Sequence, residues 1–139
     1  MPDASEFSHG QLPGSLELAF VGDSVYDLYV REHVTRRGGH VKELSRRATG
    51  YVNAHAQSES LKKILPLLTE EEAGIIRRAH NAKQTPTGHA DPKEYKNATA
   101  LEALIGYLYL THNVQRLDEL LGLATGLAAV MEAADVSGK

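Results

Sequence analysis

The segment LELAFVGDSVYDLYV, residues 16–30, constrains the fold more than any other part of the chain. Its residues favour an α-helix, and apolar side chains occupy nearly every side of that helix. Such a helix must be covered on several sides by other elements. The chain has 139 residues, which is enough for one domain with its own core, so this segment is predicted to be a central helix of that domain.

The pattern of apolar residues predicts further helices along the chain. The first helix is predicted to end near Thr35. Residues 41–66 are predicted to form two helical pieces with a hinge near Gly50. A last helix is predicted over residues 114–133, where apolar positions recur at helical spacing. No segment alternates apolar and polar residues as a strand does, so the predicted class is all-α, a helical bundle.

Two helix starts are marked by capping residues. Thr69 with Glu72 forms a predicted capping box ahead of a helix over residues 70–83. Asp91 is the predicted cap of the helix that begins at Pro92, and Glu94 is placed to complete a second box. Between these helices, QTPTGHAD at residues 84–91 is predicted to be an exposed loop.

The domain is predicted to span residues 12–133, with flexible ends at 1–11 and 134–139. The chain has no cysteine, which excludes disulfides, thiolate metal sites and cysteine nucleophiles. No apolar run approaches the roughly 18 residues that cross a bilayer, and the N-terminus does not resemble a signal peptide. A cytoplasmic protein with no membrane partner is therefore expected.

Each of two central helices carries one acid in its most apolar stretch. These acids are Asp23, within residues 16–30, and Glu102, within LEALIGYLYL at residues 101–110. An ionised carboxylate in a core is costly unless it is paired or bound to a cation. If the two acids meet, a divalent cation would relieve their repulsion, and Mg²⁺ prefers carboxylate oxygens and water. The alternative is that each acid pairs with a base from elsewhere in the fold: Arg31, Arg46, Arg47 or Lys96.

Charge is distributed unevenly along the chain. The formal net charge is -3, but residues 31–63 carry +5 and residues 77–96 carry +3. These two basic blocks either form a cationic face for a polyanion or are ordinary solvated helix faces. The seven histidines are scattered and form no HExxH pattern, so a zinc hydrolase is disfavoured. No phosphate-binding glycine loop is present, which disfavours a nucleotide cofactor.

Two stretches resemble the motifs of the ribonuclease III family. LAFVGDSVYDLYVR, residues 18–31, resembles the signature helix of this family, and LEALIGYLYL resembles its second motif. RRAHNAK at residues 77–83, followed by a loop and YKNATALEALIGYLYL, is similar to the miniature branch, Mini-ribonuclease III. That branch has the catalytic domain without a double-stranded-RNA-binding domain. The likeness covers about residues 12–112.

The resemblance implies an all-α endonuclease that cuts double-stranded RNA as a homodimer. The implied cofactor is Mg²⁺, with Mn²⁺ able to substitute, and the implied substrate is the precursor of large-subunit (23S) ribosomal RNA. The catalytic, metal-binding acids of the family map onto Asp23 and Glu102. Two further family acids are replaced here by Ala19 and Thr99, so the metal must take more ligands from water or RNA. Asp27, one turn after Asp23, either supports the metal or is an exposed helix acid.

The RNA backbone is predicted to be held by residues on both sides of the loop at 84–91. These candidates are Arg78, His80, Asn81 and Lys83 before the loop and Lys93 and Lys96 after it, with Arg46 and Arg47 as weaker candidates. The loop itself is either an element that enters an RNA groove or a plain connector. Two other functions stay open at this point: a non-catalytic double-stranded-RNA-binding module on the same scaffold, and an interaction scaffold without RNA.

Overall fold

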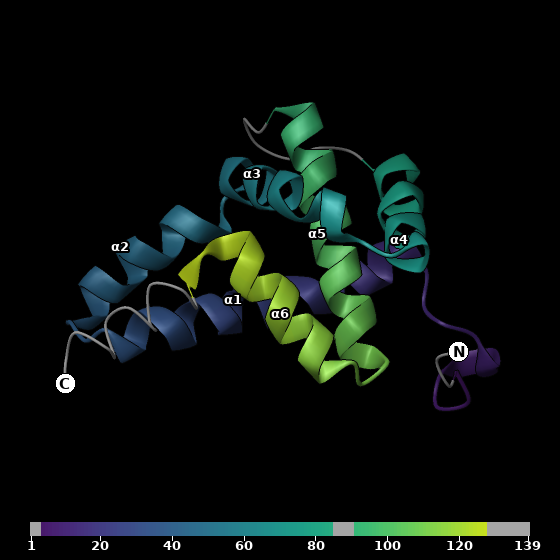
Figure 1. Cartoon of the computed structure of the whole chain (residues 1–139), viewed down its shortest axis with the longest axis horizontal. Coiled ribbons are helices and arrows are strands. Elements are labelled where there is room, and N and C mark those ends of the chain that lie inside the picture. Colours follow the sequence, from purple (N-terminus) through teal and green to yellow (C-terminus); the bar gives the residue numbers. More distant parts are fainter. Residues whose placement is uncertain (1–3, 85–90, 128–139) are drawn as a thin grey trace.

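The computed structural model describes residues 4–84 and 91–127, and this part of the chain is helical, with no strand in it (Figure 1). The prediction of an all-α fold is therefore confirmed. In chain order the elements are the short 3-10 helix η1 (Ser8–Gly10), α1 (Ser15–Arg36), α2 (Val41–Val52), α3 (Ala54–Ile64), the 3-10 helix η2 (Leu65–Leu67), α4 (Glu70–Asn81), α5 (Pro92–Leu110) and α6 (Val114–Thr125).

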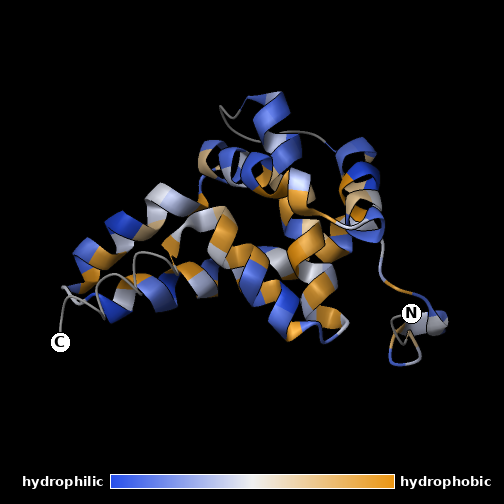
Figure 2. Ribbon diagram, viewed as in Figure 1, coloured by the Kyte–Doolittle hydropathy of each residue, from blue (hydrophilic) through white to orange (hydrophobic). Residues whose placement is uncertain are grey.

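Helix α5 is the centre of the bundle. It packs against α1, α3, α4 and α6, and its buried side chains point to several sides of the helix. Leu101, Leu104 and Ile105 have no exposed surface. Figure 2 shows hydrophobic residues concentrated along α5 and α6 in the middle of the molecule. Helix α2 lies along α1 and also contacts α3, and it extends with the end of α1 away from this centre (Figure 1).

The two helical pieces predicted over residues 41–66 are present, but the break between them is displaced from Gly50 by three residues. Gly50 lies inside α2, and the break falls at Asn53 instead. The side-chain oxygen of Asn53 accepts a hydrogen bond from the backbone N–H of Ala56 at 2.8 Å, which caps α3. The boundary between α2 and α3 is therefore set by Asn53, which satisfies a free N–H of α3, and not by Gly50.

The capping box at Thr69 and Glu72 is confirmed. The Glu72 N–H donates to the Thr69 hydroxyl at 3.1 Å, and the Thr69 N–H donates to the Glu72 carboxylate at 2.9 Å. Glu72 is only 5% exposed, and its carboxylate also accepts two hydrogen bonds from Arg116 of α6 at 2.8 Å. These contacts lower the pKa of Glu72, the Arg116 hydrogen bonds being the largest cause, and they join α4 to α6.

The start of α5 is capped as predicted, except for one side chain. Asp91 accepts hydrogen bonds from the N–H groups of Lys93 and Glu94 at 2.8 and 3.2 Å. Glu94 was predicted to complete a capping box, but its carboxylate pairs instead with His55 of α3. The Glu94 side chain therefore joins α5 to α3 and does not cap its own helix.

The last helix, predicted over residues 114–133, is present up to Thr125 and is interrupted at Gly126. Helix α6 ends at Thr125, because Gly126 adopts a left-handed backbone conformation with a φ of 74° that stops a right-handed helix. Residues 128–133 lie outside the described part of the chain. None of the helices in the described ranges is long and apolar enough to span a membrane.

Candidate active site

Two glycines let α1 and α5 cross almost backbone to backbone. A Cβ atom added at Gly22 would lie 1.7 Å from the backbone oxygen of Glu102, and one added at Gly106 would lie 1.9 Å from that of Leu18. Real side chains do not tolerate such distances, so both positions require glycine. Asp23 directly follows Gly22, and Glu102 lies one turn before Gly106. The crossing therefore brings the two predicted acids together.

The Asp23 and Glu102 carboxyl groups meet in an open pocket of about 350 Å³ between α1 and α5. The other lining residues are Leu16, Ala19, Phe20, Gln84, Tyr95 and Thr99. The sequence indicated that both acids lie in the core, and this is wrong for Asp23, which is exposed, while Glu102 is half-buried. Helix α5 covers α1 at Gly22, whereas the side of α1 that carries Phe20 and Asp23 is exposed among the described residues.

Neither acid has a basic partner within residues 4–84 and 91–127. The Lys and Arg ion pairs of these residues involve other acids: Asp27, Glu32, Glu43, Glu59, Glu72 and Glu119. The alternative pairing with Arg31, Arg46, Arg47 or Lys96 is therefore not what the structure contains. Asp27 is bound to Arg31 at 2.9 Å, which favours its role as an exposed helix acid.

Burial and the neighbouring acid together change the titration of Glu102. Loss of solvent raises its pKa to about 8, helped by the hydrogen bond and the charge of Asp23. Gln57 of α3 opposes this shift, because its side-chain N–H donates to the Glu102 carboxylate at 3.3 Å. At neutral pH and without a metal, Glu102 therefore keeps its proton. A raised pKa of this kind is typical of a carboxyl group that is buried beside another acid.

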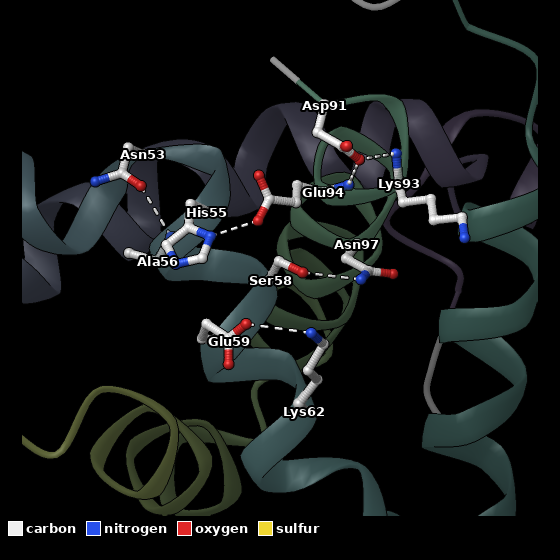
Figure 3. A network of polar contacts seen from close by, with 10 residues as sticks. All are labelled: Asn53, His55, Ala56, Ser58, Glu59, Lys62, Asp91, Lys93, Glu94 and Asn97. Atoms are coloured by element: carbon white, nitrogen blue, oxygen red, sulfur yellow. Dashed lines mark hydrogen bonds and ion pairs between the residues drawn. The ribbon is translucent and has the colours of Figure 1, made fainter.

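Helix α3 is fixed on the first half of α5 by two polar contacts (Figure 3). His55 pairs with Glu94, and the side-chain N–H of Asn97 donates to the hydroxyl of the buried Ser58 at 2.9 Å. Both contacts lie beside Gln57, whose side chain is buried, so they hold the donor that reaches Glu102. Sequence reasoning missed Gln57, because only the packing of α3 on α5 brings it to the acid pair.

The residues present suit a divalent cation of the magnesium type. Two converging carboxylates without a basic partner supply hard oxygen ligands, and a cation would replace the proton of Glu102. Among the described residues, no cluster of three or more His, Cys, Asp or Glu side chains is placed to hold a metal ion. Most ligands of a bound cation would therefore be water or substrate oxygens.

The pKa of Glu102 predicts how stability depends on pH when metal is absent. Between about pH 4.5 and 8 the folded protein keeps a proton that the unfolded chain loses, so stability falls as the pH rises through this range. Glu102→Gln removes the titrating group. In a chelator, the variant is expected to gain on the order of 2 kcal/mol over the parent protein between pH 4 and pH 9, measured by denaturant unfolding. Glu17→Gln, an exposed acid of α1, should show no such gain, and an equal stability gap at both pH values would contradict the prediction.

The six predicted RNA contacts lie at facing ends of two helices. Arg78, His80 and Asn81 belong to the last turns of α4, Lys83 follows, and Lys93 and Lys96 lie in the first turns of α5. All except the half-buried His80 are exposed, and none forms an ion pair with an acid of the described residues. Of the predicted loop at residues 84–91, residues 85–90 lie outside the described part of the chain.

The two weaker RNA candidates differ in their surroundings. Arg47 is held by Glu43 at 3.1 Å and by the backbone oxygen of Gly38 at 2.9 Å, so its charge is already used within the protein. Arg46 is exposed on α2. The structure therefore separates two residues that the sequence treated alike.

Comparison with known proteins decides the family. The model of the ribonuclease III domain matches residues 16–113, which include both acids and both glycines of the crossing. The chain belongs to the ribonuclease III family. It is thus an endoribonuclease, and its family acts on double-stranded RNA.

Relatives of this ribonuclease III chain carry the name Mini-ribonuclease 3. The protein from Symbiobacterium thermophilum is 45% identical over 115 residues, which are 78% of this chain and 85% of that protein. The protein from Thermoanaerobacter sp. is 46% identical and covers 78% of each chain. The crystal structure of protein FN1578 from Fusobacterium nucleatum is similar with a TM-score of 0.75 and 37% identity, covering 78% of this chain and 90% of that one. The predicted resemblance to the miniature branch is therefore confirmed.

Proposed function

We propose that this ribonuclease hydrolyses the backbone of double-stranded RNA at Asp23 and Glu102 with Mg²⁺ as cofactor, for which Mn²⁺ can substitute. The observation that carries the proposal is the meeting of two carboxyl groups in an open pocket without a basic partner. The biological substrate proposed from the resemblance is the precursor of large-subunit (23S) ribosomal RNA, processed in the cytoplasm.

Three side chains at the pocket have a defined task in this proposal. Asp23 and Glu102 would supply carboxylate oxygens to the cation, and the proton of Glu102 would be released to solvent. Gln57 donates to one oxygen of Glu102 at 3.3 Å and so fixes the orientation of that carboxylate. When bound, Mg²⁺ lowers the pKa of water and offsets the charge that develops on the phosphate. No residue of the pocket needs to form a covalent bond with RNA.

The basic ends of α4 and α5 are proposed to hold the RNA backbone. Arg78, His80, Asn81, Lys83, Lys93 and Lys96 provide donors to phosphates and 2′-hydroxyls, by which A-form duplexes are recognised mostly through their shape. Because these contacts displace counterions, binding is expected to weaken by roughly one log unit per log unit of salt for each phosphate contact. Duplex length, more than sequence, then governs affinity.

A homodimer is proposed to form through the apolar surface of α1. Phe20 is 80% exposed and Leu28 is 66% exposed, although both lie on the helix that carries Asp23. Beside them are Tyr109 of α5, 52% exposed, and Val114 of α6, 67% exposed. Two adjoining hollows of about 350 Å³ each run along this surface and share Val25, Leu28 and Tyr109. A second copy covering this surface would explain why α1 is apolar on the side that no described element covers.

Charge placed in this surface is expected to separate the dimer. Leu28→Glu would bury an uncompensated carboxylate in the contact, which costs several kcal/mol, so a monomer is expected in sedimentation analysis at micromolar concentration. Val41→Glu changes an apolar residue on α2 that is 81% exposed, and this variant should sediment with the mass of the parent protein. If Leu28→Glu sediments as the parent protein does, the surface is not the dimer contact.

The proposed function is tested by incubating the protein with a structured duplex from large-subunit ribosomal RNA precursor. Discrete cleavage products are expected with millimolar Mg²⁺ or Mn²⁺, and none with a chelator. The sequence left open a second candidate, a non-catalytic RNA-binding module, because Ala19 and Thr99 replace two acids that the resemblance implies; membership of an endoribonuclease family disfavours it. That candidate predicts salt-sensitive retention of the duplex with no cleavage under either condition.

A further inference from the structure

The acid pocket contains the two positions where this chain lacks an acid found in longer family members. Ala19 and Thr99 both line the pocket with Asp23 and Glu102. Thr99 is 7% exposed and lies on the same face of α5 as Glu102, one turn earlier. No third carboxylate or histidine of the described residues joins this group. The other polar side chains that line this pocket beside the two acids, Gln84, Tyr95 and Thr99, are neutral.

Gln84 reaches this position from outside α5. It lies three residues after the end of α4 and lines the pocket beside Thr99. The Thr99 hydroxyl donates to the backbone oxygen of Tyr95 at 3.0 Å and also lies 3.3 Å from the side-chain oxygen of Gln84. The side-chain nitrogen of Gln84 is buried and has no hydrogen-bond partner. One hydroxyl hydrogen thus serves two acceptors while a buried donor beside it is unused.

Reversing the carboxamide of Gln84 removes this mismatch. The oxygen and nitrogen ends of a carboxamide have nearly the same shape, so its orientation follows from its hydrogen bonds. In the reversed orientation the Gln84 nitrogen donates to the Thr99 hydroxyl, whose own hydrogen remains on Tyr95. The Gln84 oxygen is then the free group, and a buried acceptor without a partner needs a donor from a ligand or water.

We propose that Gln84, held by Thr99, is a positioning residue that takes the place of the missing family acid and accepts a hydrogen bond from cation-bound water. This inference rests on the proposed function of Asp23 and Glu102 as metal ligands. In this proposal the neutral side-chain oxygen of Gln84, held in place by Thr99, replaces a charged carboxylate oxygen carried by α5 itself. The site then carries one negative charge fewer at this position, and its orientation of water depends on the segment that follows α4.

Manganese binding, followed by electron paramagnetic resonance without RNA, tests the inference. Gln84→Leu removes the acceptor and is expected to weaken Mn²⁺ binding about tenfold, the usual effect of losing a group that orients a metal ligand. Thr99→Val removes the hydroxyl group that holds Gln84 and keeps the volume of the side chain, so it should also weaken Mn²⁺ binding. Thr99→Ser keeps the hydroxyl group and should not weaken it. Gln84→Glu restores a carboxylate and should bind Mn²⁺ more tightly than the parent protein. Gln11→Leu, the same change at an exposed glutamine away from the pocket, is the control.

Two comparisons separate the possible failures. If Asp23→Asn abolishes Mn²⁺ binding and Gln84→Leu leaves it unchanged, Gln84 has no role at the cation and the inference fails alone. If Asp23→Asn also leaves Mn²⁺ binding unchanged, the proposed metal site itself is wrong. Thermal unfolding in a chelator should be similar for the parent protein and Gln84→Leu. Cleavage by Gln84→Leu should recover at high Mg²⁺, and recovery only at high RNA concentration would overturn the inference in favour of an RNA contact.

Discussion

Asp23→Asn is expected to lower the rate of duplex RNA cleavage by about 10³-fold or more, while the protein stays folded and still binds the duplex. Asparagine keeps the shape of the side chain but removes the charge that would hold the cation. Because Asp23 is exposed and makes no ion pair, the substitution leaves the core untouched. Single-turnover cleavage at saturating RNA measures the chemical step, and a filter-binding assay in a chelator measures the duplex affinity.

Asp27→Asn is the matched control for this experiment. Asp27 lies one turn further along α1 and is paired with Arg31 at 2.9 Å, away from the pocket. Its loss removes a surface ion pair, which is worth at most about 1 kcal/mol, so cleavage should remain within a few-fold of the parent rate. Retained cleavage in Asp23→Asn, or an equal loss in both variants, would remove Asp23 from the mechanism.

Gly22→Ala is expected to destabilise the fold by about 4 kcal/mol or to prevent folding. The added methyl group would lie 1.7 Å from the backbone oxygen of Glu102, so α1 and α5 would have to separate along their whole contact. Thermal unfolding by circular dichroism measures the effect. Since a small domain has only about 5–15 kcal/mol of stability, the transition should shift by many degrees.

Gly50→Ala makes the same chemical change but is expected to stabilise the protein. Gly50 lies inside α2, and a Cβ atom there would meet nothing within 4 Å. Alanine is the better helix former by about 1 kcal/mol, so this variant should melt at a higher temperature than the parent protein. A Gly22→Ala protein that melts like the parent would show that the two helices do not cross at this glycine.

Local features of the sequence predicted the helices well. Thr69 with Glu72 and Asp91 with Pro92 mark helix starts through contacts within a few residues, and both are found in the structure. The errors concern helix ends at which two local features of the sequence indicated different boundaries. Asn53, rather than Gly50, ended α2, and Gly126 ended α6 although apolar spacing continued beyond it. In each case the deciding factor was backbone conformation or capping, which apolar periodicity does not report.

The site was predictable only in part. The two acids were identified because a carboxylate is unusual in an apolar helix, but their meeting depends on how α1 crosses α5. Gln57 and Gln84 were missed for the same reason, since each reaches the pocket from another part of the fold. The sequence did contain an indication that the two acids meet, because Gly22 directly precedes Asp23 and Gly106 lies four residues after Glu102. Small residues at that spacing are what a close helix crossing requires.

The glycine crossing has a consequence for anyone who wishes to redesign this enzyme. The atoms that set the gap between α1 and α5 also set the separation of Asp23 and Glu102. Widening that gap to admit a larger ion would dismantle the hydrophobic centre at the same time. Engineering of metal preference must therefore begin at the rim, at residues such as Gln84, where the scaffold can absorb a change.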